Sequence, residues 1–494
     1  MLLFALISYH ILVAGALCLN LLSRGVVHNA SEGFYCKLAY QCSVGEPLYA
    51  SDEDIRNDRC MYTPLSFEIQ GLAIRLFGLD IRVQRLVSAF FGLGSMVLIA
   101  LIVRRLTKST FWAVLAAGLF SGIDVSYWYV MVSPNSAHVF FALLGLYLLM
   151  RGPSLTWVAC MAAVCALFGS FWSKQTGLAY VVAGLFYIFT QDLKKGAVSA
   201  LVTLLLAGGF MEYYAAPPGS QFLYRVFVWA TIEPMMWSRF MTPVLFPELL
   251  GRFGVMIALV VAGVLALPFS FKEYARPHFV FLGAAAFAGP WAELKYGSGN
   301  MQSIFFYGLL IIGGISFLHS FLKNKKIAVV LAYVLVGVQS MALVHEVKPM
   351  FISDEDEQRF NKIISILSTP GESSYFYAHG YYNVLAGKPP VANTEQNSVE
   401  HWKNGRSVYA KTVTEYWQSN PFDRLILFYP WEDNMRIVLE QVQKDYDLAE
   451  EIQPSVDYPS TWELRKRLLV FKRKTPAQAM PGAGPLGPLK RQGP

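Results

Sequence analysis

The sequence has 494 residues, of which 54% are hydrophobic and 15% are charged, and its net charge is +7. Soluble proteins carry about 25% charged residues, so this composition excludes an ordinary soluble enzyme and a disordered chain. The basic residues stand in short clusters between long apolar runs and form no basic stripe. This placement argues against a nucleic-acid partner and predicts a membrane protein.

Eleven apolar runs predict a polytopic α-helical membrane protein. The first, Leu2 to Leu22, lacks a basic leader and a clear cleavage site, so we expect a retained helix. Several of the other runs are shorter than the roughly 20 residues of a typical span, and flanking aromatic residues complete the short ones. They cover about 86–103, 111–130, 137–150, 155–172, 178–190, 197–212, 253–270, 278–292, 303–322 and 327–344.

The basic clusters predict the orientation. Every even-numbered span is followed by Lys or Arg: Arg104, Arg105 and Lys108; Arg151; Lys194 and Lys195; Lys272 and Arg276; Lys323, Lys325 and Lys326. By the positive-inside rule these ends are cytoplasmic. The N-terminus is then cytoplasmic, the C-terminal part is external, and we expect the chain in the plasma or inner membrane of the cell envelope.

The polar segments complete the predicted organisation. A membrane domain, 1–345, contains two external loops, 23–84 with two interfacial helices and 213–251. Within the second loop, Phe222 to Phe240 suits a helix on the membrane surface, although a plain loop fits almost as well. Residues 346–473 predict a small external α/β domain, and 474–494 a disordered tail rich in Pro and Gly. The predicted strands of this α/β domain are Ser374–Tyr377, Arg424–Tyr429 and Arg467–Lys472, and its predicted helices are Asp354–Leu367 and Met435–Tyr446.

Cys36, Cys42 and Cys60 lie in the first external loop. An oxidising compartment would permit one disulfide among them, and three pairings are possible. Their spacing does not resemble a zinc site.

Four polar positions near the predicted external face are candidates for chemistry. Glu32, soon after the first span, suits a general base, or else a solvated loop acid. Lys174 and Gln175 break two apolar helices, where the cation either binds a phosphate or extends to water. Lys295 and Asn300 flank two glycines at another external helix end, which is also a plausible plain turn. In the turn holding Asn135, His138 is a possible phosphate ligand or a polar interfacial residue.

The order of short motifs resembles the GT-C membrane glycosyltransferases, in particular the glycosyltransferase family 39-like group of protein O-mannosyltransferases and aminoarabinose transferases. The likeness runs from the first helix to about residue 473. Its motifs are Glu32-Gly33-Phe34-Tyr35, Gly45-Glu46-Pro47-Leu48-Tyr49, Tyr62-Thr63-Pro64-Leu65, Leu76-Phe77-Gly78 before Arg85-Leu86, Lys174-Gln175, Lys295-Tyr296-Gly297-Ser298 with Asn300, Gly380-Tyr381-Tyr382-Asn383 and Gly387-Lys388-Pro389-Pro390.

The resemblance implies a polyprenyl-phosphate-linked sugar as donor, an inverting transfer at the external face, and a lipid, glycan or protein as acceptor. It makes Glu32 the base and Lys174, Gln175, Lys295 and Asn300 the donor-phosphate residues. The family's usual base is Asp, whereas this chain has Glu32. The family's second acid corresponds to Asn135, so a paired acid is in doubt.

The remaining acids Asp52 and Asp54, with Asn135 and His138, are candidates for the acceptor region. The sequence names no cofactor and no metal ligand set, and a need for a divalent metal is left open. Two rival functions also remain: a transporter or flippase of a lipid-linked saccharide, and a catalytically inactive relative. Midplane charges in two symmetric halves would favour transport, and this sequence has neither.

Overall fold

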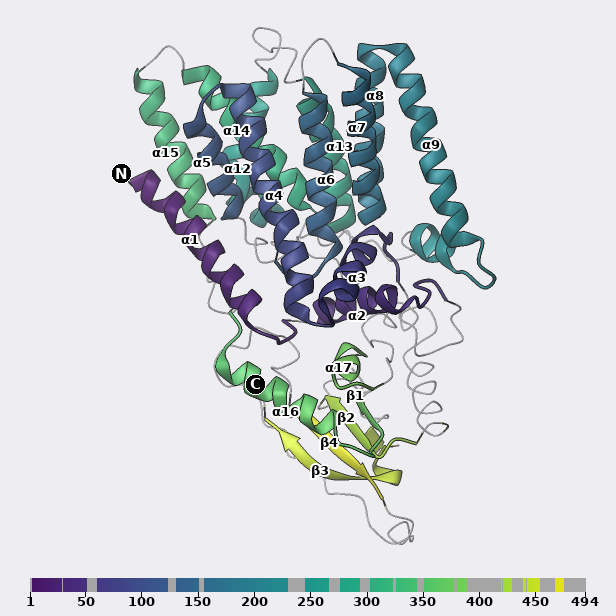
Figure 1. Ribbon diagram of the computed structural model, residues 1–494. Coiled ribbons are helices and arrows are strands. Elements are labelled where there is room, and N and C mark those ends of the chain that lie inside the picture. Colours follow the sequence, from purple (N-terminus) through teal and green to yellow (C-terminus); the bar gives the residue numbers. More distant parts are fainter. Residues whose placement is uncertain are drawn as a thin grey trace.

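The computed structural model describes residues 2–28, 30–50, 60–122, 130–150, 155–229, 245–265, 276–293, 303–322, 326–343, 351–376, 380–388, 419, 421–428, 439–440, 442–453 and 467–474. Long helices stand side by side in one layer, two short helices lie across one end of that layer, and a small sheet lies beyond them (Figure 1). The arrangement places α2, α3 and the sheet at one end of an apolar bundle.

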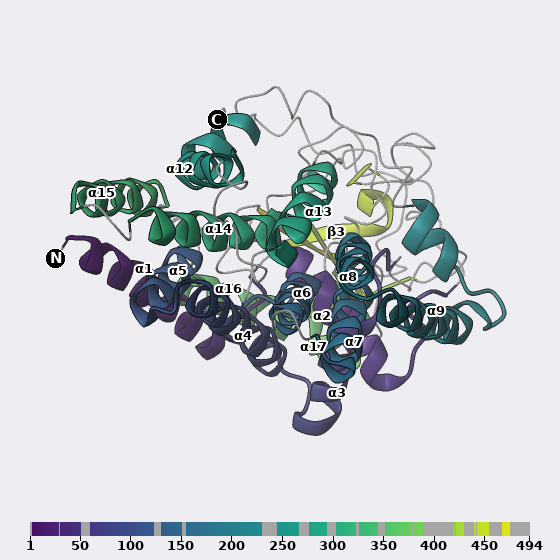
Figure 2. The same ribbon diagram turned by 90° about the horizontal axis from the view of Figure 1, so that it is seen from above.

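Each of the eleven predicted spans contains a helix. They are α1 (Leu2–Ser23), α4 (Ile81–Thr107), α5 (Thr110–Ser121), α6 (Pro134–Leu149), α7 (Trp157–Ser173), α8 (Leu178–Gln191), α9 (Leu193–Ala215), α12 (Leu245–Leu265), α13 (Arg276–Glu293), α14 (Ile304–Leu322) and α15 (Lys326–Ala342). Seen from above, α12, α14 and α15 line one side of the bundle, and α7, α8 and α9 lie at its far end (Figure 2). The predicted polytopic helical fold is confirmed.

The surface of this bundle is apolar. Phe90, Leu93 and Val97 on α4 are 57–66% exposed, and Leu201, Leu204 and Leu205 on α9 are 54–68% exposed. Among the described residues, three helices are long and apolar enough to cross a membrane by length and composition, namely Leu3–Ser23, α4 and α9. Shorter apolar helices pack beside them. Exposed apolar side chains over whole helices are what a lipid-facing surface requires.

Helix ends are set by local chemistry. Asp80 caps α4, its carboxylate accepting from the Arg82 amide, and Lys108 closes the helix in the left-handed region at φ 59°. Thr156 and Asp192 cap α7 and α9 in the same way. These caps satisfy amides that an isolated helix end leaves unpaired.

The first of the two predicted external loops contains the two helices expected there, α2 (Ala30–Val44) and α3 (Leu65–Phe77). They lie across the end of the bundle, between the long helices and the sheet (Figure 1). They approach closely because Gly71 has no side chain: a Cβ there would meet Cys42 Cβ at 2.7 Å and Ala39 O at 2.8 Å. In the second loop, 222–223 is helical, Tyr224–Trp229 is helical with π-type hydrogen bonding, and 230–240 of the predicted helix lies outside the described residues.

The C-terminal part holds a four-stranded mixed sheet of order β1-β2-β4-β3. The strands are β1 (Ser374–Phe376), β2 (Arg424–Phe428), β3 (Tyr446–Ile452) and β4 (Leu468–Arg473). β1 runs parallel to β2, with Tyr375 opposite Leu425, whereas β4 is antiparallel to both β2 and β3. Two helices, α16 (Asp354–Leu367) and α17 (Gly380–Leu385), accompany the sheet.

The local sequence explains α16 well. Ser353 and Asp356 form a reciprocal capping box, and four acids occupy the first turn, where the helix dipole favours them. The three predicted strands correspond to β1, β2 and β4. The predicted helix Met435–Tyr446 is wrong at its C-terminal end, because Tyr446 begins strand β3, which pairs with β4 and was not predicted. The domain boundary at 345 and the disordered tail stay predictions.

Candidate functional site

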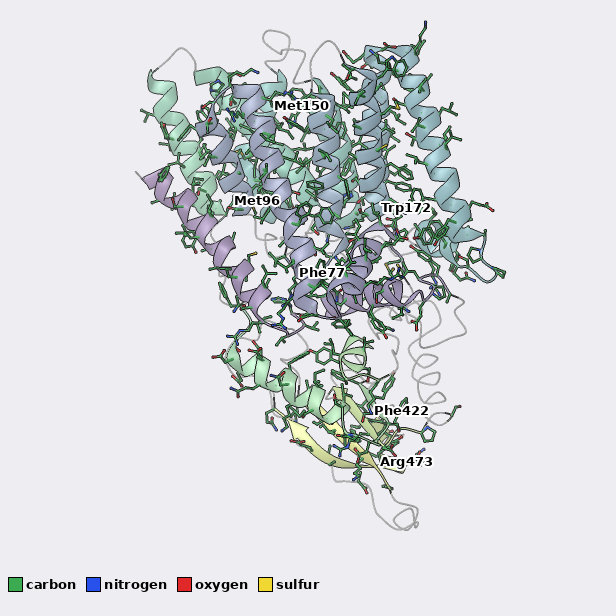
Figure 3. The ribbon with its side chains drawn as sticks, in the orientation of Figure 1. Phe77, Met96, Met150, Trp172, Phe422 and Arg473 are labelled. Atoms are coloured by element: carbon green, nitrogen blue, oxygen red, sulfur yellow. The ribbon has the colours of Figure 1, made fainter. Side chains whose placement is uncertain are left out.

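The candidate residues that the structure describes lie at the end of the bundle that faces α2, α3 and the sheet. Trp172, near the end of α7, and Met150, after the end of α6, lie at opposite ends of the bundle (Figure 3). Lys174 follows α7 directly, Asn135 stands in the first turn of α6, and Glu32 stands in the first turn of α2. Chain segments far apart in sequence therefore meet at one face.

Glu32 is fully buried and both its oxygens accept hydrogen bonds. Oε1 accepts from Arg85 Nε at 2.8 Å and from the Val132 amide at 3.1 Å. Oε2 accepts from Arg85 Nη2 at 2.6 Å and from the His28 amide at 2.7 Å. The carboxylate thus ties α2 to the N-terminal part of α4 and to the segment that precedes α6.

These contacts fix the charge state of Glu32. Burial raises the pKa of the carboxyl, but the Arg85 charge and its hydrogen bonds outweigh burial, so the pKa is lowered overall. A carboxylate held this way is a stable anion and a weak base. To take a proton from an acceptor, it must first separate from Arg85. The role of base, predicted from the sequence, stays a prediction.

Arg85 is the centre of the arrangement. Besides Glu32, its guanidinium donates to Leu21 O at 2.6 Å, Arg24 O at 2.9 Å and Val26 O at 2.7 Å. The side chain is completely buried. The planar fork of arginine suits such simultaneous bonding, so Arg85 fastens the linker between α1 and α2 against α4.

Lys174 and Gln175 lie in the break between α7 and α8. Lys174 is 4% exposed and donates to Asn135 Oδ1. Gln175 donates to Met61 O, and to Val226 O at 3.3 Å. The break is tight because Gly177 packs on the end of α7, where a Cβ would meet the Phe171 amide nitrogen at 2.4 Å. The predicted lysine is therefore a buried cation and does not extend to bulk water.

His138 lies on the inner side of this break. Its Nδ1 is 2.9 Å from Ser170 Oγ, its Nε2 is 3.3 Å from Thr176 Oγ1, and its ring stacks on Tyr180 with centroids 5.4 Å apart. The side chain is buried. These contacts hold α6, α7 and α8 together, and they place His138 beside the Lys174 segment.

A cavity of about 720 Å³ opens nearby, between the end of α2, the helix α3 and the end of α9. Its polar lining includes Glu46, Glu68, Arg75 and Tyr214. Tyr214 donates its hydroxyl to Glu68, and burial raises the pKa of Glu68. Arg75 donates to Ser43 O at 2.6 Å and to Cys42 O. The cavity thus offers carboxyl and aromatic groups at the level of the interfacial helices.

Several predicted residues lie outside the described part of the chain: Asp52, Asp54, Lys295 and Asn300. Cys36, Cys42 and Cys60 are all described, and the structure contains no disulfide among them. Burial raises the pKa of Cys36 and of Cys42, which keeps both protonated. Within the described residues, no group of three or more His, Cys, Asp or Glu side chains could hold a metal ion.

Sequence reasoning missed the role of Arg85, although it stands in a quoted motif. A signal existed: a charged residue at the border of a long apolar run needs a partner. Glu32 is that partner, 53 positions away. Tyr381, which contacts the same region, also stands in a family-like motif, but its partner could not be read from it. Arg24 and Gln84 carried no pattern that distinguishes them from surface residues.

The whole fold is similar to that of GT-C membrane glycosyltransferases. The structure of ArnT from Cupriavidus metallidurans bound to undecaprenyl phosphate covers 96% of this chain and 99% of its own, with 12% identity and a TM-score of 0.59. The apo form of the same protein gives a TM-score of 0.57 at 12% identity, covering 94% of this chain and 97% of its own. The Archaeoglobus fulgidus oligosaccharyltransferase gives 0.52 at 13% identity, covering 92% of this chain and 73% of its own.

The sequence adds a second finding. Residues 62–213 match the family model of the dolichyl-phosphate-mannose-protein mannosyltransferases. No curated protein sequence matches the chain. The predicted resemblance to GT-C glycosyltransferases of the family 39-like group is thus confirmed, and the chain is an integral, multi-pass membrane protein of this fold.

Proposed function

We propose that this protein is a glycosyltransferase that moves a sugar from a polyprenyl-phosphate donor to an acceptor at the external membrane face, with inversion. The observation that carries the proposal is the buried Lys174, set in a helix break beside Asn135 at the end of a GT-C fold. The structurally similar ArnT was solved with undecaprenyl phosphate, and the matching family model describes dolichyl-phosphate-mannose-dependent enzymes.

The donor's phosphate needs cations near the membrane surface. A buried ammonium stabilises an anion more strongly than an exposed one, because the surrounding dielectric is lower. Lys174 would therefore bind the phosphate and stabilise the charge that develops as it leaves. Lys295 and Asn300 remain the proposed second set of donor residues.

The proposed step is a single displacement. The acceptor's oxygen or nitrogen attacks the anomeric carbon, the bond from that carbon to the phosphate oxygen breaks, and polyprenyl phosphate leaves with the electron pair. The proton of the acceptor passes to a base. One displacement inverts the anomeric centre and requires no covalent enzyme intermediate.

Glu32 has two possible roles in this step. Acting as base, it would have to leave Arg85; acting as a fixed anion, it would hold Arg85 and α2 in place. The full set of hydrogen bonds and the lowered pKa favour the second role. Replacing Glu32 with Asp separates the two, because a shortened base retains some transfer whereas a shortened anchor loses folded protein.

The cavity beside α3 suits the acceptor better than the donor. Glu46 and Glu68 would repel a phosphate, and Arg75 already serves the last carbonyls of α2. Carboxyl groups and tyrosines favour a hydroxyl-bearing or cationic acceptor. We therefore assign this cavity to the acceptor.

The orientation follows from charge. The described basic residues that follow even-numbered spans, Arg104 and Arg105 at the end of α4 and Lys194 and Lys195 at the start of α9, lie at helix ends away from the sheet (Figure 1). With basic ends in the cytoplasm, the candidate site, α2, α3 and the sheet face outward, and the N-terminus is cytoplasmic.

A radiolabelled polyprenyl-phosphate sugar supplied to the purified protein in liposomes tests the proposal. We expect transfer of label to an acceptor extract and release of polyprenyl phosphate. Movement of the intact donor across the bilayer without transfer would instead identify a transporter, and neither event with any donor would identify an inactive relative. Either of the last two results contradicts the proposal.

A further inference from the structure

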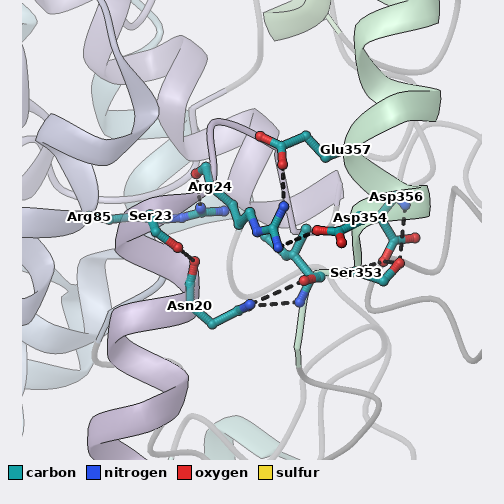
Figure 4. A network of polar contacts seen from close by, with 9 residues as sticks. Asn20, Ser23, Arg24, Arg85, Ser353, Asp354, Asp356 and Glu357 are labelled. Carbon is teal, nitrogen blue, oxygen red and sulfur yellow. Dashed lines mark hydrogen bonds and ion pairs between the residues drawn. The ribbon is translucent and has the colours of Figure 1, made fainter.

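We propose that the external C-terminal domain is a positioning element of the transfer site: it holds the linker between α1 and α2 and thereby fixes the Glu32–Arg85 pair. The inference rests on the proposed function for its effect on catalysis, but its structural part stands on three separate contacts. Figure 4 shows the outer part of this network.

The first contact joins the end of α1 to the chain that leads into α16. Asn20 Nδ2 donates to Ile352 O at 3.1 Å, and the Ile352 amide donates to Asn20 Oδ1 at 2.8 Å. The side-chain amide of Asn20 thus bonds to both the carbonyl and the amide of the same residue, Ile352. This paired geometry fixes the segment that leads into α16 beside α1.

The second contact uses charge. Arg24, in the linker, donates to Asp354 Oδ1 at 2.5 Å and also to Glu357, both in the first turn of α16 (Figure 4). The capping box of Ser353 and Asp356 fixes the start of α16. The acids that meet Arg24 are therefore presented by a well-formed helix end.

The third contact is buried. Tyr381, from α17, accepts a hydrogen bond from Gln84 Nε2 at 2.9 Å, and both side chains are at most 1% exposed. Gln84 precedes Arg85 in α4. The domain thus touches α4 one residue away from the arginine that bonds Leu21 O, Arg24 O and Val26 O.

The linker is consequently held from both sides. The external domain holds the end of α1 at Asn20 and the linker at Arg24, and Arg85 holds the linker backbone from the side of the membrane. Beyond Arg85 the contacts continue to Glu32 and to the Val132 amide. Three residues after Val132 stands Asn135, the hydrogen-bond partner of Lys174.

Loosening the domain should therefore misplace the site without removing any group that touches substrate. Arg24, Tyr381 and Asn20 act through Arg85, and none of them is proposed to contact donor or acceptor. Their loss should lower turnover more than donor binding, because it acts first on the Glu32–Arg85 pair, whereas Lys174 keeps its own hydrogen bond to Asn135.

The test compares three variants of the full-length protein with one control. Arg24→Ala and Tyr381→Phe each remove one contact, and the combined variant removes both. The matched control is Lys362→Ala, which breaks an ion pair of α16 with Glu450 inside the external domain and leaves the linker untouched.

The first readout is amide hydrogen exchange of peptides covering 27–34 and 130–134, which needs no enzyme activity. We expect exchange to accelerate roughly 5-fold in Tyr381→Phe, which leaves the buried Gln84 donor unpaired, and by up to about 5-fold in Arg24→Ala. Lys362→Ala should exchange like the wild type. Equal exchange in all variants would overturn the proposal.

The second readout is transfer activity. We expect kcat to fall in parallel with the faster exchange, while the donor KM stays within about twofold of the wild-type value. We also expect the charge-reversed variant, in which Arg24→Glu is combined with Asp354→Arg and Glu357→Arg, to be more active than Arg24→Glu alone. Altered exchange with unaltered kcat would contradict positioning. A wild type without transfer activity would reject the proposed function, whereas the exchange result would still decide the structural part.

Discussion

Two ion pairs lie on either side of the linker between α1 and α2, and they are built very differently. Glu32 and Arg85 are completely buried, and each also bonds to the backbone: Glu32 accepts from the His28 amide, and Arg85 donates to Val26 O. Arg24 and Asp354 stand at the surface, with side chains 26% and 79% exposed. The same two types of charge therefore meet in two environments within a few residues of each other.

The difference in burial predicts different roles for the two ion pairs, one in the stability of the fold and one in the position of the linker. A buried pair costs desolvation when it forms, and losing one member leaves the other charge stranded. An exposed pair contributes about 0–1 kcal/mol and is screened by salt. The inner pair is thus expected to be required for folding, and the outer pair to tune where the linker lies.

The largest expected effect comes from Arg85→Ala. It strands the Glu32 carboxylate in a buried site and frees three backbone carbonyls, so we expect a loss of about 3–5 kcal/mol of stability. Yield of monodisperse protein and thermal unfolding in detergent measure it. The double variant Arg85→Leu with Glu32→Leu should recover part of the loss, and a stable, active Arg85→Ala protein would contradict the comparison.

A second variant tests whether the buried Lys174 binds the donor phosphate. Lys174→Ala removes a buried ammonium, and losing a charge-assisted bond should raise the donor KM about 10- to 100-fold. The control is Lys194→Ala, an exposed lysine at the start of α9. Equal donor binding in the two variants would remove Lys174 from the phosphate site.

The inner pair also predicts a pH dependence. The pKa of Glu32 is lowered from its ordinary 4.5, so its contribution is complete above that value and is lost as pH falls through the lower, folded pKa. Between pH 6 and 3, the free energy of unfolding should fall more steeply with decreasing pH in the wild type than in Glu32→Gln. Parallel curves would mean that Glu32 does not carry this charge.

The smallest effect belongs to the outer pair. Arg24→Ala should change thermal stability by at most about 1 kcal/mol, and 1 M NaCl should reproduce its effect on exchange of residues 27–34 in the wild type, because the Debye length there is about 3 Å. The variant itself should be insensitive to salt in this segment. A salt response that persists in the variant would show that other charges hold the linker.

Hydropathy predicted the helices well because each span must be apolar along its length, and α16 was predicted from its amphipathic pattern. Strand β3 was missed because Asp447, Glu450 and Glu451 stand on a strand that pairs with β4 alone, so its pattern is polar. Glu32 was recognised as a candidate, but its pairing with Arg85 depends on how α2 packs against α4, which no local pattern contains.

The most direct test of the central claim is donor turnover by purified protein carrying Lys174→Ala, compared with wild type and Lys194→Ala, with a labelled polyprenyl-phosphate sugar. The account predicts sugar transfer by the wild type and by Lys194→Ala, and strongly reduced transfer with a raised donor KM in a folded Lys174→Ala protein. Transfer by all three proteins at the same rate and the same KM would contradict it.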